Sequence, residues 1–491
     1  MTGPRLTRIE MFLLGVSLLV AIAYFARVPQ NPGGFFVDEA SIAYNAHTIS
    51  SRGVDEYGHA FPLYFRAFGE YKSPVYIYAL AGIFKFTGPS TFVARAFSAF
   101  LGLATALLLG VLGYRISGRR DTALIVFISA GLTPWFFEIS RLVFEVTLLP
   151  VILVVFLILI HTASRRTEWP WPIPIAIGLL LGLIVYTYPG GRVLAVLLAL
   201  GLVLFLTRRR WRAVIFAFVI FGLTLLPLAI FAKKNPEALG ERFKYVTYIQ
   251  PGDTRTQIVV RFAQNYINNF SPRSWLLRGD PEPRHHLPGM GSMLAGVTIP
   301  ALLGLVLVLV KFRRDAWWRF VVFGLAISPI PASLTLDHFH TLRLIALPVF
   351  VIVLTVPAIK FLQSTSLRGS AIRHTALAIL VVIIILQGAL FQWRFQTATP
   401  RVDAFDSYYP ELLTAALNQP ERPIYLVDKT PAAYMYAFWY ATVRGLGIEN
   451  FHRIPRHEPP PPGVVVISHD LPCSNCEMIA ERGQFRVYRQ K

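Results

Sequence analysis

Charged residues are scarce in this chain of 491 residues: they make up 15% of it, against about 25% in water-soluble proteins. Acidic side chains are the scarcer sign, with 27 Asp and Glu against 47 Lys and Arg. The sequence also lacks a phosphate-binding loop, a dinucleotide-binding glycine motif and an internal repeat of soluble type. The low charged fraction excludes a chain that is water-soluble as a whole, and the missing motifs leave no soluble catalytic signature.

Cysteine is nearly absent, with only Cys473 and Cys476 near the C-terminus. Two further ligands at zinc-finger spacing are missing, so a structural metal site is disfavoured. In an oxidising compartment the two cysteines would instead form a local disulfide. Catalytic redox chemistry is the third and weakest interpretation.

Apolar residues are abundant, at 54% of the chain, and they occur in long runs. A bilayer core is about 30 Å thick, so a spanning helix needs roughly 17 to 25 apolar residues. Eleven stretches approach this length, and the sequence therefore predicts a polytopic membrane protein with a helical bundle. They centre on residues 11–27, 93–114, 122–138, 143–161, 172–188, 191–207, 212–232, 293–311, 317–335, 342–361 and 374–393.

The net charge of +20 reflects basic residues grouped on every second connection between these stretches. Cytoplasmic loops are enriched in Lys and Arg, so this pattern places the N-terminus on the cytoplasmic side of the cytoplasmic membrane and the C-terminus on its outer side. The first stretch could be a signal peptide, but Arg27-Val28-Pro29 is a poor cleavage site, which favours an uncleaved helix. The basic clusters are residues 5–8, 115–120, 165–166, 208–212, 311–314 and 360–373.

Three segments interrupt the apolar pattern, at residues 28–92, 233–292 and 394–491. The first has helical periodicity after Phe35, which predicts a helix along the membrane surface. The second is rich in Gly and Pro and reads as loop with short helices. The third has apolar runs typical of buried strands around a helical stretch, which predicts a small α/β domain. We therefore expect a transmembrane domain over 1–393 and an extracytoplasmic α/β domain over 394–491.

Polar and ionisable residues gather in the short turns at the predicted outer ends of the spans. Such residues are costly near lipid, and those that are kept usually face a cavity and mark a functional path. Three arginines in these turns run against the cytoplasmic bias, which calls for an anionic partner. The residues are Asp38, Glu39, Arg141, Glu145, Tyr186, Tyr188, Arg192, Asp337, His338, His340 and Arg343.

Structural explanations compete with function at each of these positions. Asp38 could cap the surface helix, because its carboxylate would accept from the free amide groups of the first turn. Arg141 and Glu145 have the spacing of a helical i,i+4 ion pair. Each signal is weak alone, and their shared location carries the functional hypothesis.

The remaining basic residues also have structural explanations. Arg192 and Arg343 could extend their guanidinium groups to lipid phosphates. His285 and His286 lie in a long loop, where histidines are more often solvated than bound to metal. No metal ligand set is therefore assigned from the sequence.

Seven ordered motifs between residues 10 and 390 resemble those of bacterial polytopic glycosyltransferases of the C superfamily (GT-C), which are similar to protein O-mannosyltransferases and lipid A aminoarabinose transferases. The Asp-Glu pair after a first span gains specificity from the Lys-x-Pro motif and the later motifs. The motifs are Phe36-Val37-Asp38-Glu39-Ala40, Tyr71-Lys72-Ser73-Pro74, Arg95-Ala96-Phe97-Ser98-Ala99, Ser140-Arg141-Leu142-Val143-Phe144-Glu145, Tyr186-Thr187-Tyr188 with Arg192, Gly279-Asp280 with Arg284-His285, and Pro331-Ala332-Ser333-Leu334-Thr335.

The resemblance implies transfer of a sugar from a polyprenyl-phosphate carrier to a hydroxyl group of a lipid, glycan or protein outside the cytoplasmic membrane. It implies catalytic roles for Asp38 as general base and for Glu39 beside it. No cofactor is required, although a divalent metal is compatible, and no nucleic acid is expected. The implied substrate-binding residues are Lys72, Arg141, Glu145, Tyr188, Arg192, Asp280, Arg284, His285, Asp337, His340 and Arg343.

Three rival functions remain open from the sequence. A flippase or transporter of lipid-linked sugars would show two related halves and polar residues at mid-membrane, and the sequence has neither feature. An accessory protein would leave the acidic pair and the outer arginines unexplained. A metal-assisted oligosaccharide transferase would use Asp38, Glu145, Asp337 or His338 as ligands of a hard cation.

Overall fold

The computed structural model describes residues 6–238, 240–364, 370–398, 401–428, 433–455, 458–469 and 475–491. Two compact units divide the chain. The helical unit comprises Met1–Ala26, Ser98–Arg141 and Glu145–Ala398. The mixed unit comprises Arg27–Phe97, Leu142–Phe144 and Thr399–Lys491.

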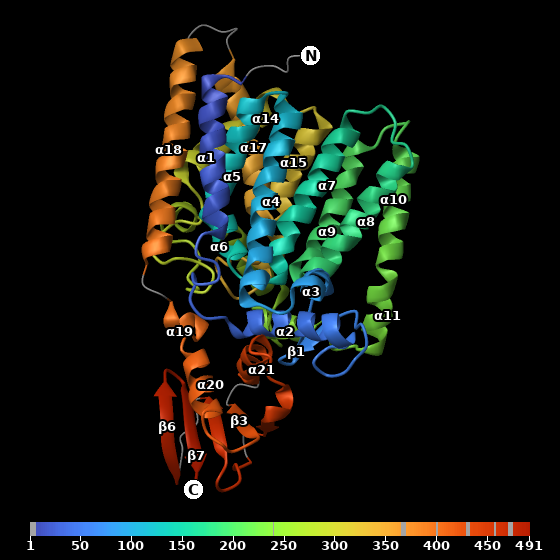
Figure 1. Cartoon of the computed structure of the whole chain (residues 1–491). Helices are drawn as coiled ribbons and strands as arrows, with labels where there is room; N and C mark the ends of the chain where they lie inside the picture. The colour runs from blue at the N-terminus through green and yellow to red at the C-terminus, as the bar shows by residue number, and fades with distance from the viewer. Residues whose placement is uncertain are drawn as a thin grey trace. The chain divides into compact units, whose positions relative to one another are not determined.

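The helical unit is a bundle of apolar helices joined by short turns (Figure 1). Helix α4 begins in the mixed unit and continues into the bundle. The elements are α1 (Arg8–Phe25), α4 (Thr91–Ser117), α5 (Arg120–Leu132), α6 (Pro134–Ser140), η1 (Glu145–Thr147), α7 (Leu148–Ser164), α8 (Pro172–Thr187), α9 (Pro189–Gly201), η2 (Leu202–Phe205), α10 (Trp211–Thr224), α11 (Leu226–Lys234), α12 (Glu241–Val246), α13 (Arg255–Asn268), η3 (Ser274–Arg278), α14 (Ala295–Lys311), α15 (Ala316–Ile327), α16 (Ile330–Ser333), α17 (Leu347–Gln363) and α18 (Ser370–Thr397).

Helix α17 forms the centre of the bundle and is apolar on every side, as expected for a helix without a solvent face. It packs against α5, α14, α15 and α18. The contact with α14 is close: a Cβ atom on Gly304 would lie 1.7 Å from the carbonyl oxygen of Leu354. A small residue at this point allows the two backbones to approach each other, as is common between membrane helices.

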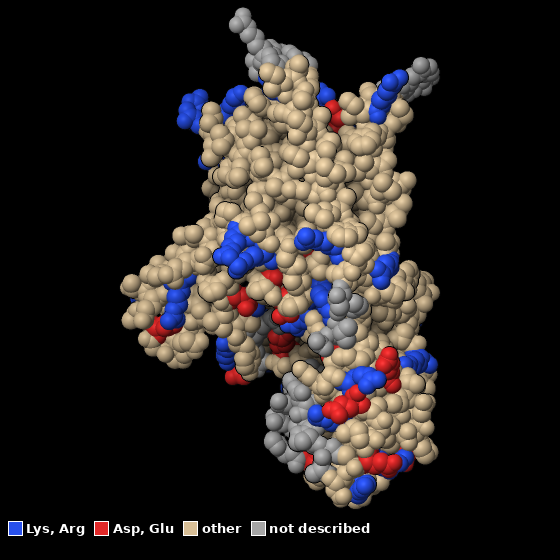
Figure 2. Space-filling model, turned by 90° about the vertical axis from the view of Figure 1, so that its left-hand side faces the viewer, with Lys and Arg blue, Asp and Glu red and all other residues tan. Residues whose placement is uncertain are grey.

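The outer helices expose apolar side chains. The most apolar stretches of α1 and α18 are only 17% buried, and so is that of the α10–α11 pair. Figure 2 shows a broad band of bundle surface without Lys, Arg, Asp or Glu, next to a rim of basic side chains. An apolar surface of this extent is explained by contact with lipid. The chain is a membrane protein, as predicted.

Each of the eleven apolar stretches contains helix, but the number of crossings stays a prediction. Within the described residues, five helices are long and apolar enough to cross a membrane, or six if α5 and α6 count as one span. That pair is bent by 59° at Thr133-Pro134, which breaks the stretch predicted over 122–138. The reason is Pro134, which cannot donate an amide hydrogen and disfavours helical backbone in the residue before it.

The mixed unit combines Arg27–Phe97 with the C-terminal region. In the first of these segments, helix α2 follows Phe36 and a hairpin precedes α3, with Phe65 paired to Lys72 across its two strands. The elements are α2 (Val37–Arg52), β1 (Phe65–Ala67), β2 (Glu70–Lys72), α3 (Pro74–Thr87), α19 (Val402–Phe405), α20 (Tyr409–Leu417), β3 (Ile424–Asp428), α21 (Tyr434–Val443), η4 (Ile448–Asn450), β4 (Phe451–Ile454), β5 (Val465–His469), β6 (Cys476–Arg482) and β7 (Phe485–Gln490).

The predicted C-terminal α/β region is confirmed as a five-stranded mixed sheet of order β4-β3-β5-β7-β6. Strands β3, β4 and β5 are parallel, whereas β7 runs antiparallel to both β5 and β6. The two predicted strands match β3 and β5, and the helix between them matches α21. Cys473 lies outside the described residues, so its disulfide with Cys476 stays a prediction.

Candidate functional site

The Asp38 carboxylate forms an ion pair with Lys72, and both residues belong to the mixed unit. The Lys72 ammonium donates to Asp38 Oδ1 over 2.6 Å. The lysine side chain is only 7% exposed, whereas that of the aspartate is 33% exposed. The Asp-Glu motif and the Lys-x-Pro motif, 34 residues apart, thus meet at one point. The aspartate keeps an accessible face, as a group that acts on an external substrate must.

The helix that carries Asp38 starts one residue before it. Phe36 is the N-cap of α2, so Asp38 lies in the first turn and the suggestion that it caps the helix is wrong. The backbone amide of Phe36 donates to Glu39 Oε2 over 2.9 Å. Glu39 therefore holds the start of the helix, and the side chain of Asp38 is not needed for that purpose.

Glu39 is fully buried, and its carboxylate accepts hydrogen bonds from Arg95 and from two backbone amides. Arg95 donates two parallel hydrogen bonds to its carboxylate, over 3.0 and 2.7 Å. The backbone amides of Phe36 and Val143 donate two more, over 2.9 and 3.0 Å. A carboxylate has about four acceptor positions, so these contacts saturate it. The geometry is that of a structural residue, which holds the start of the helix that carries Asp38.

Arg95 was missed as a site residue, although its motif contributed to the resemblance. Its side chain is 1% exposed, and besides Glu39 it donates to the carbonyl oxygens of Pro29 and Pro32. A planar guanidinium with five donors can hold a carboxylate and two carbonyls at once. The available signal was an arginine at the start of an apolar stretch, where an unpaired charge would be costly.

Helix α21 of the C-terminal region packs against α2 within the mixed unit. Trp439 is fully buried and stacks on Phe35, with ring centroids 5.3 Å apart. The Tyr434 hydroxyl donates to Glu56 over 2.7 Å. The C-terminal region therefore supports the segment just before the Asp38 helix, a role that its sequence did not indicate.

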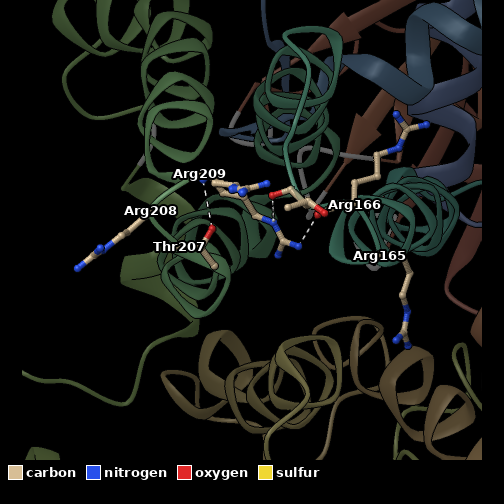
Figure 3. A pocket seen from close by; sticks show the side chains of 7 residues that line it. Arg165, Arg166, Thr207, Arg208 and Arg209 are labelled. Atoms are coloured by element: carbon tan, nitrogen blue, oxygen red, sulfur yellow. Dashed lines mark hydrogen bonds between the residues drawn. The ribbon is translucent and has the colours of Figure 1, made fainter.

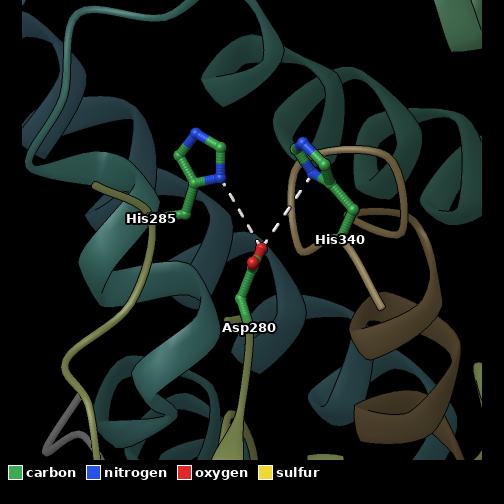
Figure 4. Close-up of side chains that lie close together, drawn as sticks. All are labelled: Asp280, His285 and His340. Atoms are coloured by element: carbon green, nitrogen blue, oxygen red, sulfur yellow. Dashed lines mark ion pairs between the residues drawn. The ribbon is translucent and has the colours of Figure 1, made fainter. Parts of the chain in front are cut away.

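In the helical unit, Asp280, His285 and His340 form a second cluster (Figure 4). The Asp280 Oδ2 atom lies 3.6 Å from His285 Nδ1 and 4.0 Å from His340 Nδ1. Asp280 and His285 are 4% and 6% exposed. Predicted residues from two separate segments, 280–285 and the turn after α16, are thus brought together. Their possible ligand atoms lie within 4.8 Å of one another.

The protonation states in this cluster follow from burial and mutual charge. Burial favours the neutral form of Asp280, yet the nearby imidazoles of His285 and His340 hold its pKa well below the usual range. Burial, with the charges of His285 and Arg343, lowers the pKa of His340 to about 3. At neutral pH the cluster therefore combines a carboxylate with a neutral imidazole at His340.

The expectation that His285 and His286 are solvated is wrong, since both are buried. His286 Nδ1 lies 2.5 Å from Glu138 Oε2, and its Nε2 lies 2.7 Å from the carbonyl oxygen of Met290. Burial opposes charge here, but the Glu138 carboxylate outweighs it and raises the pKa of His286. The pair connects the segment around His286 to α6. Sequence reasoning missed it because the partners are 148 residues apart.

Arg141 is buried and holds backbone of the same unit. It donates to the carbonyl oxygens of Tyr24 over 2.9 Å and of Ala26 over 2.8 Å. Arg141 and Glu145 do not belong to one helix, as an i,i+4 helical pair would require, because α6 ends at Ser140 and the next helical turn, η1, begins at Glu145. Arg141 is the N–H donor that anchors the end of α1, and Glu145 is also buried.

The other predicted residues of the helical unit lie in turns between its helices. Tyr188 is the N-cap of α9, and Arg192 lies half-buried in the first turn of that helix. Arg343 forms an ion pair with Asp337, whose side chain is 48% exposed. Arg284 donates to Glu282 over 2.8 and 3.0 Å. Asp38 belongs to the mixed unit. That these residues converge with Asp38 on one site therefore stays a prediction.

A pocket of about 390 Å³ lies between the turn after α7 and the turn after η2 (Figure 3). Five of its seven lining residues are arginines, and Arg210 donates to the carbonyl oxygens of Ser164, Arg166 and Thr167. Helix α8 separates this end from Tyr188 by a full helix length. The pocket matches the predicted cytoplasmic clusters and is distinct from the candidate site.

Comparison with known proteins is informative at the levels of fold and of one sequence segment. Residues 53–235 match the sequence model of the dolichyl-phosphate-mannose-protein mannosyltransferase family. No curated protein matches the chain significantly. ArnT from Cupriavidus metallidurans in the apo state superimposes with a TM-score of 0.61 at 11% identity, over 97% of each chain. The chain has the GT-C fold.

ArnT from the same organism bound to undecaprenyl phosphate gives a TM-score of 0.57, again at 11% identity and over 97% of each chain. The alignment with the arabinofuranosyltransferase AftD from Mycobacteria covers 99% of this chain and 40% of AftD, with a TM-score of 0.46 at 11% identity. The resemblance to GT-C glycosyltransferases drawn from the motifs is confirmed. These comparisons do not test the roles of individual residues.

Proposed function

We propose that this chain is a membrane glycosyltransferase that moves a sugar from a polyprenyl-phosphate carrier to a hydroxyl acceptor on the outer face of the cytoplasmic membrane. The observation that carries the proposal is the Asp38–Lys72 ion pair, which joins an acid and a base on two GT-C-like motifs. The polyprenyl-phosphate donor is supported by two similarities: residues 53–235 match the dolichyl-phosphate-mannose-protein mannosyltransferase family, and the structurally similar ArnT has been solved bound to undecaprenyl phosphate.

In this mechanism Asp38 is the general base. The acceptor hydroxyl gives its proton to the Asp38 carboxylate while its oxygen forms a bond to the anomeric carbon. The bond from that carbon to the carrier phosphate breaks, and the phosphate leaves with the electron pair. A general base must lie about 2.6 to 3.2 Å from the proton donor, and the 33% exposure of Asp38 leaves a face for it. Direct displacement inverts the anomeric configuration.

Lys72 assists the departing phosphate. Its ammonium has three donors, so it can contact Asp38 and a phosphate oxygen together. A preformed cation in a water-poor site stabilises developing negative charge more than it stabilises the ground state. Arg192 and Arg343 remain proposed phosphate ligands. Arg141 is the least suited of the arginines, because its guanidinium is buried against two carbonyl oxygens.

The test compares envelope lipids, glycans and proteins by mass spectrometry in cells with and without the chain. The wild-type chain should add one sugar mass to one class of molecule. Asp38→Asn should lower product formation at least about 100-fold, since general bases contribute 10² to 10⁴, and Lys72→Met should lower it similarly. The matched control is Asp121→Asn, whose carboxylate accepts from Arg119 at the start of α5.

Two results would contradict the proposal. Full product formation by inserted, folded Asp38→Asn would remove Asp38 as the base. A product that retains the donor's anomeric configuration would refute direct displacement, even if both variants are inactive. Product formation must also be unaffected in Asp121→Asn, or the loss reflects general damage to the protein.

A further inference from the structure

The Asp280, His285 and His340 cluster has the donor set of a metal site. Two imidazole nitrogens and one carboxylate oxygen are the ligands of many three-residue sites for zinc and other divalent transition metals. Both histidines turn Nδ1 toward the carboxylate of Asp280 (Figure 4). The His340 Nδ1 atom is buried and has no hydrogen-bond partner among the described residues. A buried lone pair of this kind is costly unless something binds it.

We propose that Asp280, His285 and His340 bind one divalent transition-metal ion, with Zn²⁺ as the best fit. This proposal is independent of the glycosyl transfer proposed above. With metal–ligand bonds of about 2.1 Å, tetrahedral ligand atoms lie roughly 3.4 Å apart. The present separations of 3.6 and 4.0 Å from Asp280 Oδ2 require only small side-chain movements. Three protein ligands leave a fourth position for water.

The surroundings orient the carboxylate as the outer shell of a metal site does. Thr341 donates to Asp280 Oδ2 from both its amide and its hydroxyl, each over 2.7 Å. The amide of Glu282 donates to Asp280 Oδ1 over 2.9 Å. Both acceptor positions of Oδ2 are thus used, so a metal bound at Oδ2 takes the place of the Thr341 hydroxyl hydrogen. Hydrogen bonds to a carboxylate ligand keep it in the orientation that metal binding requires.

The local charges are also compatible with a cation. The charge of Arg343 opposes a positive charge on His340, and it is offset by the carboxylate of Asp337. The metal would join two loops of the helical unit, residues 279–294 and 334–346. Both loops already contact α6, since Trp135 donates from its amide to Ser292 and from its indole to the carbonyl oxygen of Thr341. The ion therefore cross-links these two loops at one end of the helical unit.

The experiment measures metal binding by the full-length chain in detergent, without reference to activity. The purified protein is stripped with chelator, dialysed, titrated with Zn²⁺ and analysed for bound metal and for thermal unfolding. We expect about one Zn²⁺ per chain and a rise in Tm, because a ligand of the native state stabilises it by mass action. Binding of Co²⁺ should give the visible absorption bands of a low-symmetry site.

The variants are Asp280→Asn, His285→Gln and His340→Gln. Each keeps a polar side chain of similar size, and the asparagine can still accept from Thr341. The matched control is His338→Gln, an exposed histidine two residues from His340. Each of the three variants should weaken Zn²⁺ binding at least tenfold and abolish the Tm rise, whereas the control binds as wild type does.

Equal Zn²⁺ binding by wild type and the three variants would overturn the proposal, as would the absence of bound Zn²⁺ in a folded wild-type protein. The cluster would then be two imidazoles beside a buried carboxylate, without a metal-binding role. Failure of the proposed glycosyl transfer is a separate outcome. It would appear as a missing product in mass spectrometry, while Zn²⁺ binding and the rise in Tm persist.

Discussion

At the scale of single residues, two adjacent carboxylates of the same helix have different environments. Asp38 is partly exposed and pairs with one lysine, whereas Glu39 is fully buried and accepts four hydrogen bonds. A catalytic base must reach its substrate, and a residue that holds the fold must not move. The two environments therefore divide the roles that the motif alone assigned to both residues.

The first prediction concerns Glu39. Glu39→Gln leaves Arg95 buried without its counter-charge, and loss of one partner of a buried pair costs about 3 to 5 kcal/mol. We expect a large fall in Tm, measured by thermal unfolding in detergent, with transfer retained at temperatures where the variant is folded. The control is Glu168→Gln, an exposed residue whose pair with Arg209 spans 3.9 Å.

The double variant Glu39→Gln/Arg95→Gln extends this test. If the two residues act as one unit, the loss of stability in the double variant is smaller than the sum of the single losses. A Glu39→Gln protein with native Tm and no transfer would instead show that Glu39 takes part in the chemistry directly.

At the scale of elements, the closest packing in the bundle is between α14 and α17. The carbonyl oxygen of Leu354 occupies the position that a Cβ atom on Gly304 would need. The contact involves backbone, so it cannot be relieved by a rotamer change. Separation of the two helices is the remaining response, and it disturbs α17, which is buried along most of its length.

Gly304→Ala should therefore destabilise the protein, although alanine is the better helix former by about 1 kcal/mol. Overpacking typically costs 1 to 3 kcal/mol or more. The control is Gly222→Ala in α10, where a Cβ atom would meet nothing within 4 Å. We expect a lower Tm for the first variant and an equal or higher Tm for the second. The reverse order would show that α14 and α17 do not pack in this way.

A second prediction at this scale concerns pH and the C-terminal sheet. Burial raises the pKa of Asp428, at the end of β3, to about 7, against the opposing effects of the Tyr434 amide and Arg453. Between the unfolded value near 3.8 and about 7, the native state binds the proton more tightly than the unfolded state does. Stability should therefore fall as pH rises through this window, by at most about 1.4 kcal/mol per pH unit.

Asp428→Asn should remove this dependence, because asparagine stays neutral and still accepts from the Tyr434 amide. The measurement is Tm between pH 4.5 and pH 8 for both proteins. Glu411→Gln, an exposed residue of α20, serves as the control and should keep the wild-type slope. An unchanged slope in Asp428→Asn would mean that this carboxyl group is already ionised in the native state at low pH.

At the scale of the whole molecule, periodicity and composition were enough to predict the helices and the C-terminal strands, since these depend on neighbouring residues. The side-chain partners were harder to predict. Glu39 and Arg95 are 56 residues apart, and His285 and Asp280 meet His340 from another turn. One sequence carries no signal for such pairings, because any buried charge could satisfy any other. The break at Pro134 was readable, and it was overlooked within an apolar run.

Membrane orientation is the last prediction, and it follows from the basic clusters. These lie on alternate connections of the helical unit, and positive charge is retained on the cytoplasmic side. In a background with Cys473→Ser and Cys476→Ser, single cysteines at the exposed positions Ser51, Thr256 and Arg209 report the side of each loop. Intact cells treated with a membrane-impermeant maleimide should label Ser51→Cys and Thr256→Cys, whereas Arg209→Cys should react only after permeabilisation. Labelling of Arg209→Cys alone in intact cells would place Asp38 in the cytoplasm, where an outer-face acceptor could not reach it.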